Sequence, residues 1–203
     1  MVGSNQEDEK DEEVKDDKFL VKGTTALYYK SCVCGVMNDE TFGEGTIPIE
    51  IWGGKSDVAK SFAGGSGTAN DPYLISNGAE LAYLLTLIAS EEGNNRTKTS
   101  GKYYKLTNDI YLNDATKANW KETAKQWPQA KSGSDYFKGN LDGDGHMIYG
   151  MYINSTTANS GLVAMSGEAV FQNIIFRKCS VTTTTTHPAI VVGRADPYGT
   201  SNI

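Results

Sequence analysis

Short apolar segments recur in the C-terminal half of the chain. The three matching pairs are residues 150–153 and 173–176, residues 161–164 and 189–192, and residues 172–174 and 201–203. Repeats of about 20 to 50 residues built from short strands are typical of solenoids and propellers. A propeller blade needs about 40 residues for its four strands, and the pairs lie closer together than that, which favours a β-helix. We therefore predict an all-β solenoid in which each coil pairs with the one before it and buries inward aliphatic side chains.

One segment has the pattern of an amphipathic helix. Four aliphatic residues recur at the spacing of one helix face: Leu81, Leu84, Leu85 and Ile88. Asn77 and Glu80 have the spacing of a capping box at the helix start, and Gly93 and Asn94 are expected to end the helix. Because the ends of a solenoid need caps, we predict a capping α-helix near residues 79–90 at the N-terminal end of the β-helix.

From residue 102 onward the pattern changes to short strands. Residues 103–106 and 110–112 are predicted strands on either side of a turn at Asn108 and Asp109. A polar insertion over residues 113–135 follows them.

Aromatic residues in and after this insertion are candidates for contact with a sugar. They are Trp120, Trp127, Tyr136 and Tyr149. Such side chains can form a stacking platform for a glycan, but they are equally suited to half-buried packing under a long insertion, and we favour packing. Trp120 and Trp127 remain candidate binding residues.

Charge is concentrated at the N-terminus. Residues 1–18 carry eight acidic residues and three lysines, whereas the rest of the chain is close to neutral within an overall net charge of −6. An acidic run without apolar anchors does not offset the entropy of ordering, so we predict a disordered acidic leader over residues 1–18. A near-neutral body argues against nucleic acid and anionic lipid as partners, because both are bound by basic surfaces.

The domain organisation follows from these patterns. No stretch of 18 consecutive apolar residues occurs, which predicts no membrane insertion, and the N-terminus lacks a secretory signal, so export would require one that was removed or left out. Residues 19–48 are predicted to form a small Cys-containing β module. Residues 49–203 are predicted to form the β-helix, which contains a Gly/Ser-rich junction over residues 52–67 and is truncated at its C-terminus.

The cysteine count is odd, which rules out a fully paired disulfide framework within one chain. Cys32 and Cys34 are separated by one residue, a spacing compatible with half a metal site, a strained redox pair or two unrelated small residues, and Cys179 lies far away. A zinc site needs four ligands, and His146 and His187 are distant in the chain. We predict no metal and no cofactor.

Three polar residues, Asp142, Asp144 and His146, alternate along one segment, and alternate side chains of a strand share a face. Carboxylates on one sheet face could bind calcium or act in acid/base chemistry. The Asp-Gly-Asp-Gly run that starts at Asp142 also suits a turn, because Gly adopts positive φ and Asp hydrogen-bonds to nearby backbone. We favour the turn, predict no catalytic residue, and keep the three side chains as candidate binding residues.

The order of motifs over about residues 60–203 is similar to that of a known family. The motifs are residues 64–68, 71–76, 80–84, 101–110 and 137–146, followed by Gly161-Leu162-Val163. This arrangement resembles the opening of the pectin-lyase-like β-helices in bacterial surface proteins that carry the GLUG repeat. The resemblance implies a right-handed parallel β-helix, an extracellular location, adhesion or matrix roles, and no assigned catalytic residue.

A second resemblance lies further toward the N-terminus. Residues 24–35 with residues 40–45 resemble a short Cys-containing repeat in surface proteins of anaerobic Gram-positive gut bacteria. Members of that group usually carry two residues between the cysteines and a further cysteine upstream, whereas this chain has one residue between them and no upstream cysteine. That departure argues further against a metal site here.

These observations lead to one main functional hypothesis and two alternatives. The main hypothesis is a non-catalytic extracellular adhesin or structural surface module of a bacterium, whose partner is a host or matrix glycan or a surface protein. The first alternative is the N-terminal part of a β-helix polysaccharide lyase or glycoside hydrolase, with its catalytic residues in later coils. The second is a non-catalytic carbohydrate-binding module.

Overall fold

The computed structural model describes residues 25–31, 37–46, 49–89, 98–129 and 136–195. The chain divides into two compact units, Met1–Glu50 and Ile51–Ile203. In the first unit, β1 (Thr25–Ser31) and β2 (Met37–Thr46) pair antiparallel. The predicted leader over residues 1–18 and the pair Cys32 and Cys34 lie outside the described residues.

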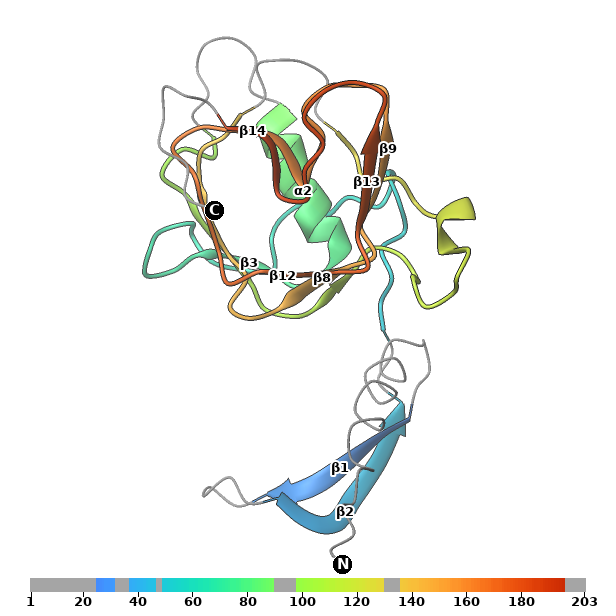
Figure 1. The fold of residues 1–203 in the computed structure, drawn as a ribbon. Coiled ribbons are helices and arrows are strands. Elements are labelled where there is room, and N and C mark those ends of the chain that lie inside the picture. The colour runs from blue at the N-terminus through green and yellow to red at the C-terminus, as the bar shows by residue number, and fades with distance from the viewer. Residues whose placement is uncertain (1–24, 32–36, 47–48, 90–97, 130–135, 196–203) are drawn as a thin grey trace, which may run out of the picture. The chain divides into compact units, whose positions relative to one another are not determined.

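The second unit consists mainly of short strands, and α2 (Gly78–Ala89) is the α-helix of its described part (Figure 1). Before the polar insertion come β3 (Tyr73–Ile75), β4 (Tyr103–Leu106) and β5 (Ile110–Tyr111), and the insertion contains a 3₁₀ helix, η1 (Trp120–Glu122). The remaining strands are β6 (Tyr136–Phe137), β7 (Asn140–Asp142), β8 (Met147–Tyr149), β9 (Tyr152–Ser155), β10 (Val163–Ser166), β11 (Val170–Gln172), β12 (Ile175–Arg177), β13 (Ser180–Thr183) and β14 (Val192–Ala195).

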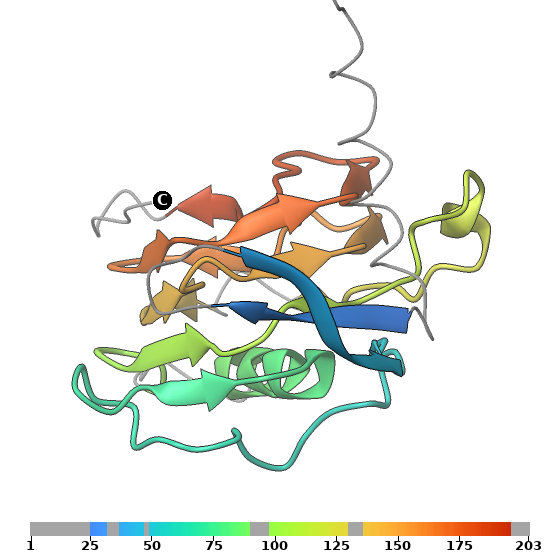
Figure 2. The same ribbon diagram turned by 90° about the horizontal axis from the view of Figure 1, so that it is seen from below.

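Strands that are distant in sequence pair in parallel within the described part of the second unit. The sheets have the orders β11-β7-β4-β3, β12-β8-β5, β14-β10-β6 and β13-β9. Each sheet therefore collects one strand from each successive pass of the chain, and the passes lie in layers, with β3 at one end and β14 at the other (Figure 2). The prediction of a strand-rich chain with parallel pairing is confirmed.

The register corrects the pairing predicted from the repeats. β12 lies on β8 with Ile175 opposite Met147, and β13 lies on β9 with Ser180 opposite Tyr152, so both sheets have the same spacing along the chain. The predicted match of residues 150–153 with residues 173–176 is wrong because these segments belong to two different sheets.

The other two predicted matches have different outcomes. Val163 of β10 lies opposite Val192 of β14, one position beyond the predicted partner Val191. Residues 201–203 lie outside the described part. Short apolar strands resemble one another, so a likeness over a few residues does not select the partner strand or its register.

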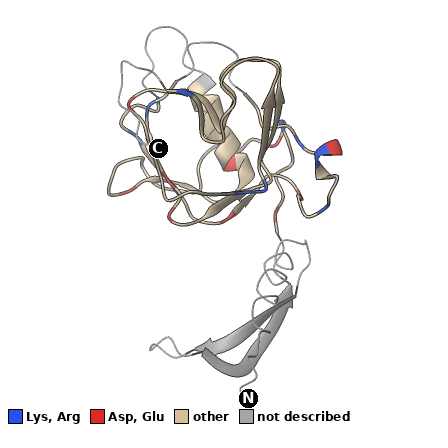
Figure 3. Cartoon of the chain, in the orientation of Figure 1, with Lys and Arg blue, Asp and Glu red and all other residues tan. Residues whose placement is uncertain are grey.

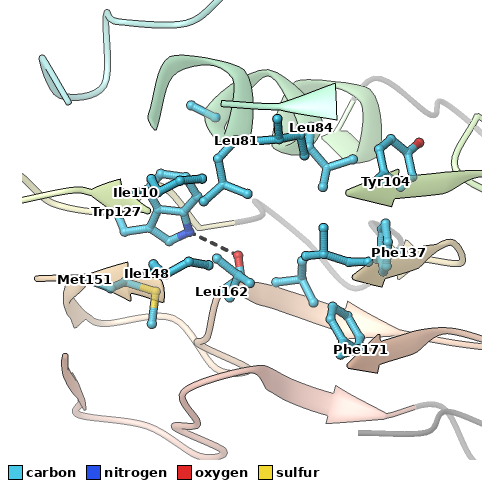
Figure 4. Packing of buried hydrophobic residues seen from close by; sticks show 14 of the residues in the cluster. Leu81, Leu84, Tyr104, Ile110, Trp127, Phe137, Ile148, Met151, Leu162 and Phe171 are labelled. Atoms are coloured by element: carbon cyan, nitrogen blue, oxygen red, sulfur yellow. Dashed lines mark hydrogen bonds between the residues drawn. The ribbon is translucent and has the colours of Figure 1, made fainter. Parts of the chain in front are cut away.

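Inward side chains of the sheets form one apolar core, and α2 packs against it (Figure 4). Leu81 and Leu84 are each 1% exposed and Ile88 is 4% exposed, while Leu85 is partly buried. The predicted apolar stripe is confirmed, since these residues contact the core rather than solvent. The helix lies beside β3 and β4, at the opposite end of the layers from β14 (Figure 2). The proposed helix end at Gly93 and Asn94 lies outside the described residues.

The start of α2 is held by side chains from the preceding turn. The Glu80 amide donates to Asn77 Oδ1 at 3.0 Å, as a capping box requires. The Glu80 carboxylate accepts from the amide and the hydroxyl of Ser76, at 2.6 and 2.9 Å, one residue earlier than predicted. Amide groups that have no partner within the helix are thereby satisfied, and the helix start is fixed next to the end of β3.

The polar insertion leaves and rejoins the layers at one buried side chain. Asn113 is 5% exposed; its Nδ2 donates to the carbonyls of Lys125 (3.0 Å) and Gly150 (2.8 Å), and its Oδ1 accepts from the Lys125 amide (2.6 Å). Asn113 therefore joins the two ends of the segment between residues 113 and 125 and ties both to the next layer. The Trp127 amide continues this attachment by donating to the Tyr152 carbonyl at 2.8 Å.

Candidate binding site

The Asp-Gly-Asp-Gly segment forms a turn that connects β7 to β8. Asp142 Oδ1 accepts from the Asp144 amide at 2.8 Å and from Asn173 at 3.0 Å, and Asp142 Oδ2 accepts from Gln172 at 2.8 Å. Burial by itself would raise the pKa of the Asp142 carboxyl. The three hydrogen bonds outweigh burial, the nearby Lys105 ammonium adds to them, and the pKa lies below its usual value. The carboxylate thus stays ionised and joins two layers.

The other two residues of the predicted polar cluster have different partners. Asp144 adopts φ 51°, and its Oδ2 lies 2.9 Å from the Lys105 ammonium. His146 Nδ1 lies 3.4 Å from Asp109 Oδ1, which also accepts the Met147 amide at 2.9 Å. Each carboxylate is therefore engaged by a neighbouring turn or strand. The geometry is that of the turn interpretation, and a binding role for Asp142, Asp144 and His146 remains a prediction.

Metal-ligating side chains do not gather in the described part of the chain, where no group of three or more His, Cys, Asp or Glu side chains could hold a metal ion. Cys179 is a free, partly buried thiol whose Sγ lies 3.4 Å from the Arg177 carbonyl and 3.7 Å from the Ile148 carbonyl. Burial raises the pKa of this thiol, so the neutral form prevails at neutral pH.

The two candidate tryptophans occupy different environments. Trp127 is fully buried, packs edge-on against Trp52 with ring centroids 5.1 Å apart, and donates from Nε1 to the Leu162 carbonyl at 3.0 Å (Figure 4). Its ring therefore offers no face to a ligand. Trp120 lies in η1, partly exposed, with its ring edge-on to Tyr152 at 5.8 Å. Packing thus accounts for Trp127, whereas Trp120 keeps a partly accessible ring.

Tyr136 and Tyr149, the other two aromatic residues of the suggested platform, are 7% and 1% exposed. The four rings do not form one exposed platform, because three of them belong to the interior of the layers.

A pocket that the sequence did not reveal lies where the Gly-rich segment, β3 and α2 meet. It has a volume of about 380 Å³ and is lined by Ser61, Phe62, Gly64, Gly65, Tyr73, Tyr83, Leu87 and Lys98. The Phe62 ring stacks on Tyr73 at 4.9 Å and meets Tyr83 edge-on at 5.0 Å. All three rings are partly exposed. This pocket is the candidate binding site of the second unit.

The residues of this pocket come from separate stretches of the chain between Ser61 and Lys98, so no local motif identifies it. The sequence does contain one indication of an aromatic site here. Phe62 and Tyr73 flank the Gly-rich segment, and Tyr83 lies outside the apolar stripe of the helix.

The segment at residues 52–67, the predicted Gly/Ser-rich junction, packs within the second unit. Trp52 is buried in the core, and the Ala63 amide donates to the Leu74 carbonyl at 3.0 Å. The Gly-rich segment therefore has a fixed place beside β3.

Charged side chains are spread over the described part of the second unit with both signs mixed (Figure 3). Within the described residues, no helix combines the length and the apolar character needed to cross a membrane.

Comparison with known proteins yields two similar sequences. The chain is 32% identical over 172 residues to halomucin of Haloquadratum walsbyi, a match that covers 81% of this chain and 2% of halomucin. It is 30% identical over 122 residues to a Gly-rich membrane protein of Evansella cellulosilytica, covering 60% of this chain and 12% of that protein. The chain therefore spans only a small part of the curated relatives it matches. No protein-family model matches the chain, and no solved structure does.

Proposed function

We propose that the second unit is part of a right-handed parallel β-helix that acts as a non-catalytic adhesin or structural module on the outside of a bacterial cell. The proposed partner is a glycan or a protein of the host surface or the surrounding matrix. The motifs between residues 64 and 163 support a relationship with the pectin-lyase-like β-helices that carry GLUG repeats.

The observation that carries the proposal is the nearly constant spacing of paired strands. In the later layers the parallel partners include Met147 and Ile175, Tyr152 and Ser180, Val163 and Val192, and Asn140 and Val170. Across these four sheets the separation along the chain varies by no more than two positions. Repeated layers with a common spacing produce an extended stack, and stacks of this kind offer long surfaces for binding and spacing at a cell surface.

The comparisons support a location at the cell envelope. One relative is named as a membrane protein, and the chain spans a small share of both relatives, which suits a module within a large protein. The engagement of Asp142, Asp144 and His146 in turns favours a non-catalytic role over acid/base chemistry.

Protease treatment of intact cells tests the location. In cells that carry the native protein, we expect an external protease to remove the epitope recognised by an antibody against residues 51–203, while a cytoplasmic control protein survives. The purified chain should also bind immobilised matrix glycans or matrix proteins. An epitope that becomes accessible only after lysis would refute the surface role.

A depolymerisation assay tests the catalytic alternative. The chain is incubated with pectate, alginate and other acidic polysaccharides, with and without calcium, and chain length is followed by viscosity and reducing ends. We expect no cleavage. Cleavage that is lost in Asp142→Asn or Asp144→Asn would replace the adhesin with a lyase or hydrolase.

A further inference from the structure

We propose that the pocket between the Gly-rich segment, β3 and α2 binds a single pyranose ring of a glycan. This inference deepens the proposed surface role by assigning it a ligand class and a site, and it rests on that role. The pocket volume of about 380 Å³ lies near the lower end of the ~300–1,000 Å³ typical of small-molecule sites. That size suits one sugar ring, with the rest of a glycan chain in solvent.

The walls supply the apolar part of sugar recognition. Phe62, Tyr73 and Tyr83 contribute three partly exposed rings, and Leu87 adds an aliphatic side chain from the next turn of α2. One face of a pyranose carries several C–H bonds and packs on an aromatic ring, because the ring face is apolar and carries partial negative charge.

The rim supplies the polar part. The Ser61 hydroxyl and the Lys98 ammonium belong to residues that line the pocket, and the rings of Tyr73 and Tyr83 end in hydroxyl groups. A few hydrogen-bonding groups around an apolar floor fix the orientation of a small ligand. This mixture fits a sugar, which has hydroxyls at its edges and C–H groups on its faces, better than it fits a hydrocarbon chain.

The aromatic side chains that line the pocket also contact the apolar core. Tyr104 is 1% exposed, and its ring centroid lies 5.5 Å from that of Phe62 and 5.6 Å from that of Tyr73. Tyr104 in turn contacts Phe137 at 5.8 Å, deeper in the core (Figure 4). Rings held in this way are ordered before the ligand arrives, which lowers the entropic cost of binding.

Two glycines allow the Gly-rich segment to close against β3. A Cβ at Gly67 would lie 2.2 Å from the Tyr73 ring, and a Cβ at Gly65 would lie 1.8 Å from the Pro72 carbonyl oxygen. Both glycines also have positive φ, 76° and 84°. The segment can therefore lie close against Tyr73 and hold its ring at the pocket. The two glycines are needed for this close contact, since any side chain there would clash.

Saturation-transfer NMR on the full chain tests the site with the methyl glycosides of glucose, galactose, mannose and N-acetylglucosamine. We expect at least one glycoside to bind, and we expect Tyr83→Ala to weaken it by about tenfold or more, as loss of an aromatic anchor does. Ala is a stronger helix former than Tyr, so this variant should keep α2 intact. Tyr83→Phe, which keeps the ring, should retain most of the binding.

Tyr103→Ala is the matched control, because it removes a ring of a residue that is 37% exposed and does not line the pocket. It should leave binding unchanged. No binding by any of the four glycosides, or binding that is lost in Tyr103→Ala and kept in Tyr83→Ala, would overturn the pocket assignment. The two proposals fail separately. A protein found on the cell surface that binds none of the glycosides keeps the surface role and removes the pocket, whereas sugar binding by a protein confined to the cell interior removes the surface role.

Discussion

The two ends of the second unit bury their apolar side chains to very different extents. Next to α2, Ile75 and Leu106 are fully buried and Leu84 is 1% exposed. In the layers that end with β14, Phe176 and Val181 lie opposite the fully buried Ile148 and Ile153, yet both are only partly buried. Ile174 and Val191 at this end are also only partly buried.

The difference follows from what covers each end. α2 contributes an apolar face to the first layers, whereas β11, β12, β13 and β14 are the outermost described strands of their sheets. Burying a large aliphatic side chain completely contributes about 1.5 to 3 kcal/mol, so a half-exposed one contributes far less. A parallel layer therefore gains its full stability only when something lies on both of its sides.

The largest expected effect concerns the covered end. Leu84→Ala should lower the free energy of unfolding of the second unit by about 3 kcal/mol, because it removes a fully buried side chain from the contact between helix and core. Urea unfolding followed by tryptophan fluorescence measures this, since all three tryptophans lie in the second unit. Leu85→Ala, at a partly buried position of the same helix, is the control and should lose less. Equal losses would contradict the proposed role of the stripe.

A buried polar side chain should come next. Asn113→Ala removes three hydrogen bonds and leaves the Lys125 amide and two carbonyls without this partner, so we expect a loss of about 2 kcal/mol. Asn108→Ala removes one exposed hydrogen bond to the Ser76 carbonyl and should cost well under 1 kcal/mol, about that of an ordinary surface change. If Asn113→Ala lowered the free energy of unfolding as little as Asn108→Ala does, other contacts would have to attach the insertion.

A smaller effect is expected at the open end. Phe176→Ala should cost about 1 kcal/mol, because the ring is only partly buried. Ile175→Ala, at a side chain that is 49% exposed, should change stability by no more than about 0.5 kcal/mol. If Phe176→Ala and Ile175→Ala lowered the free energy of unfolding by nearly as much as Leu84→Ala, the two ends would not differ in stability as proposed. Urea unfolding under the same conditions gives the comparison.

The smallest effect is electrostatic and also concerns the open end. Asp142 accepts hydrogen bonds from Gln172 at the end of β11 and from the following Asn173, and its pKa is lowered in the folded state. Its contribution is therefore present above about pH 4, the unfolded pKa, and is lost as pH falls through the folded pKa. Because the residue is partly exposed to solvent, which screens the interaction, we expect less than about 1 kcal/mol.

Unfolding curves at a series of pH values measure this contribution. Between neutral and acidic pH, Asp142→Asn should lose less stability than the natural chain does, because the natural chain loses the contribution of the Asp142 carboxylate as pH falls. Parallel pH profiles for Asp142→Asn and the natural chain would contradict the assignment.

Elements that are determined by residues close together in the sequence could be predicted. The stripe of α2 and the strands around residues 103–112 follow from local hydrophobic patterns, and the structure confirms them. The pairing of the strands could not be predicted in the same way. Apolar tetrapeptides are too alike to identify partners, and the common spacing of the paired strands is fixed by turns such as the one at Asp142.

The candidate binding site was missed for a related reason. Phe62, Tyr73 and Tyr83 come together only because the Gly-rich segment, a strand and a helix pack on one another. The sequence offered Trp127 as one candidate, a large aromatic residue in a polar segment, although packing was the favoured interpretation. Its burial beside Trp52 depends on where the insertion rejoins the layers, and no pattern within the insertion encodes that position.

The attachment at Asn113 has a consequence for how this protein can diversify. Because one side chain joins the backbone on both sides, the segment between residues 113 and 125 closes on itself before it rejoins the layers. Lengthening such a closed loop twofold costs only about 0.6 kcal/mol of chain entropy. Its interior could accept foreign sequence, an epitope or an affinity tag for example, while the layers on either side keep their register.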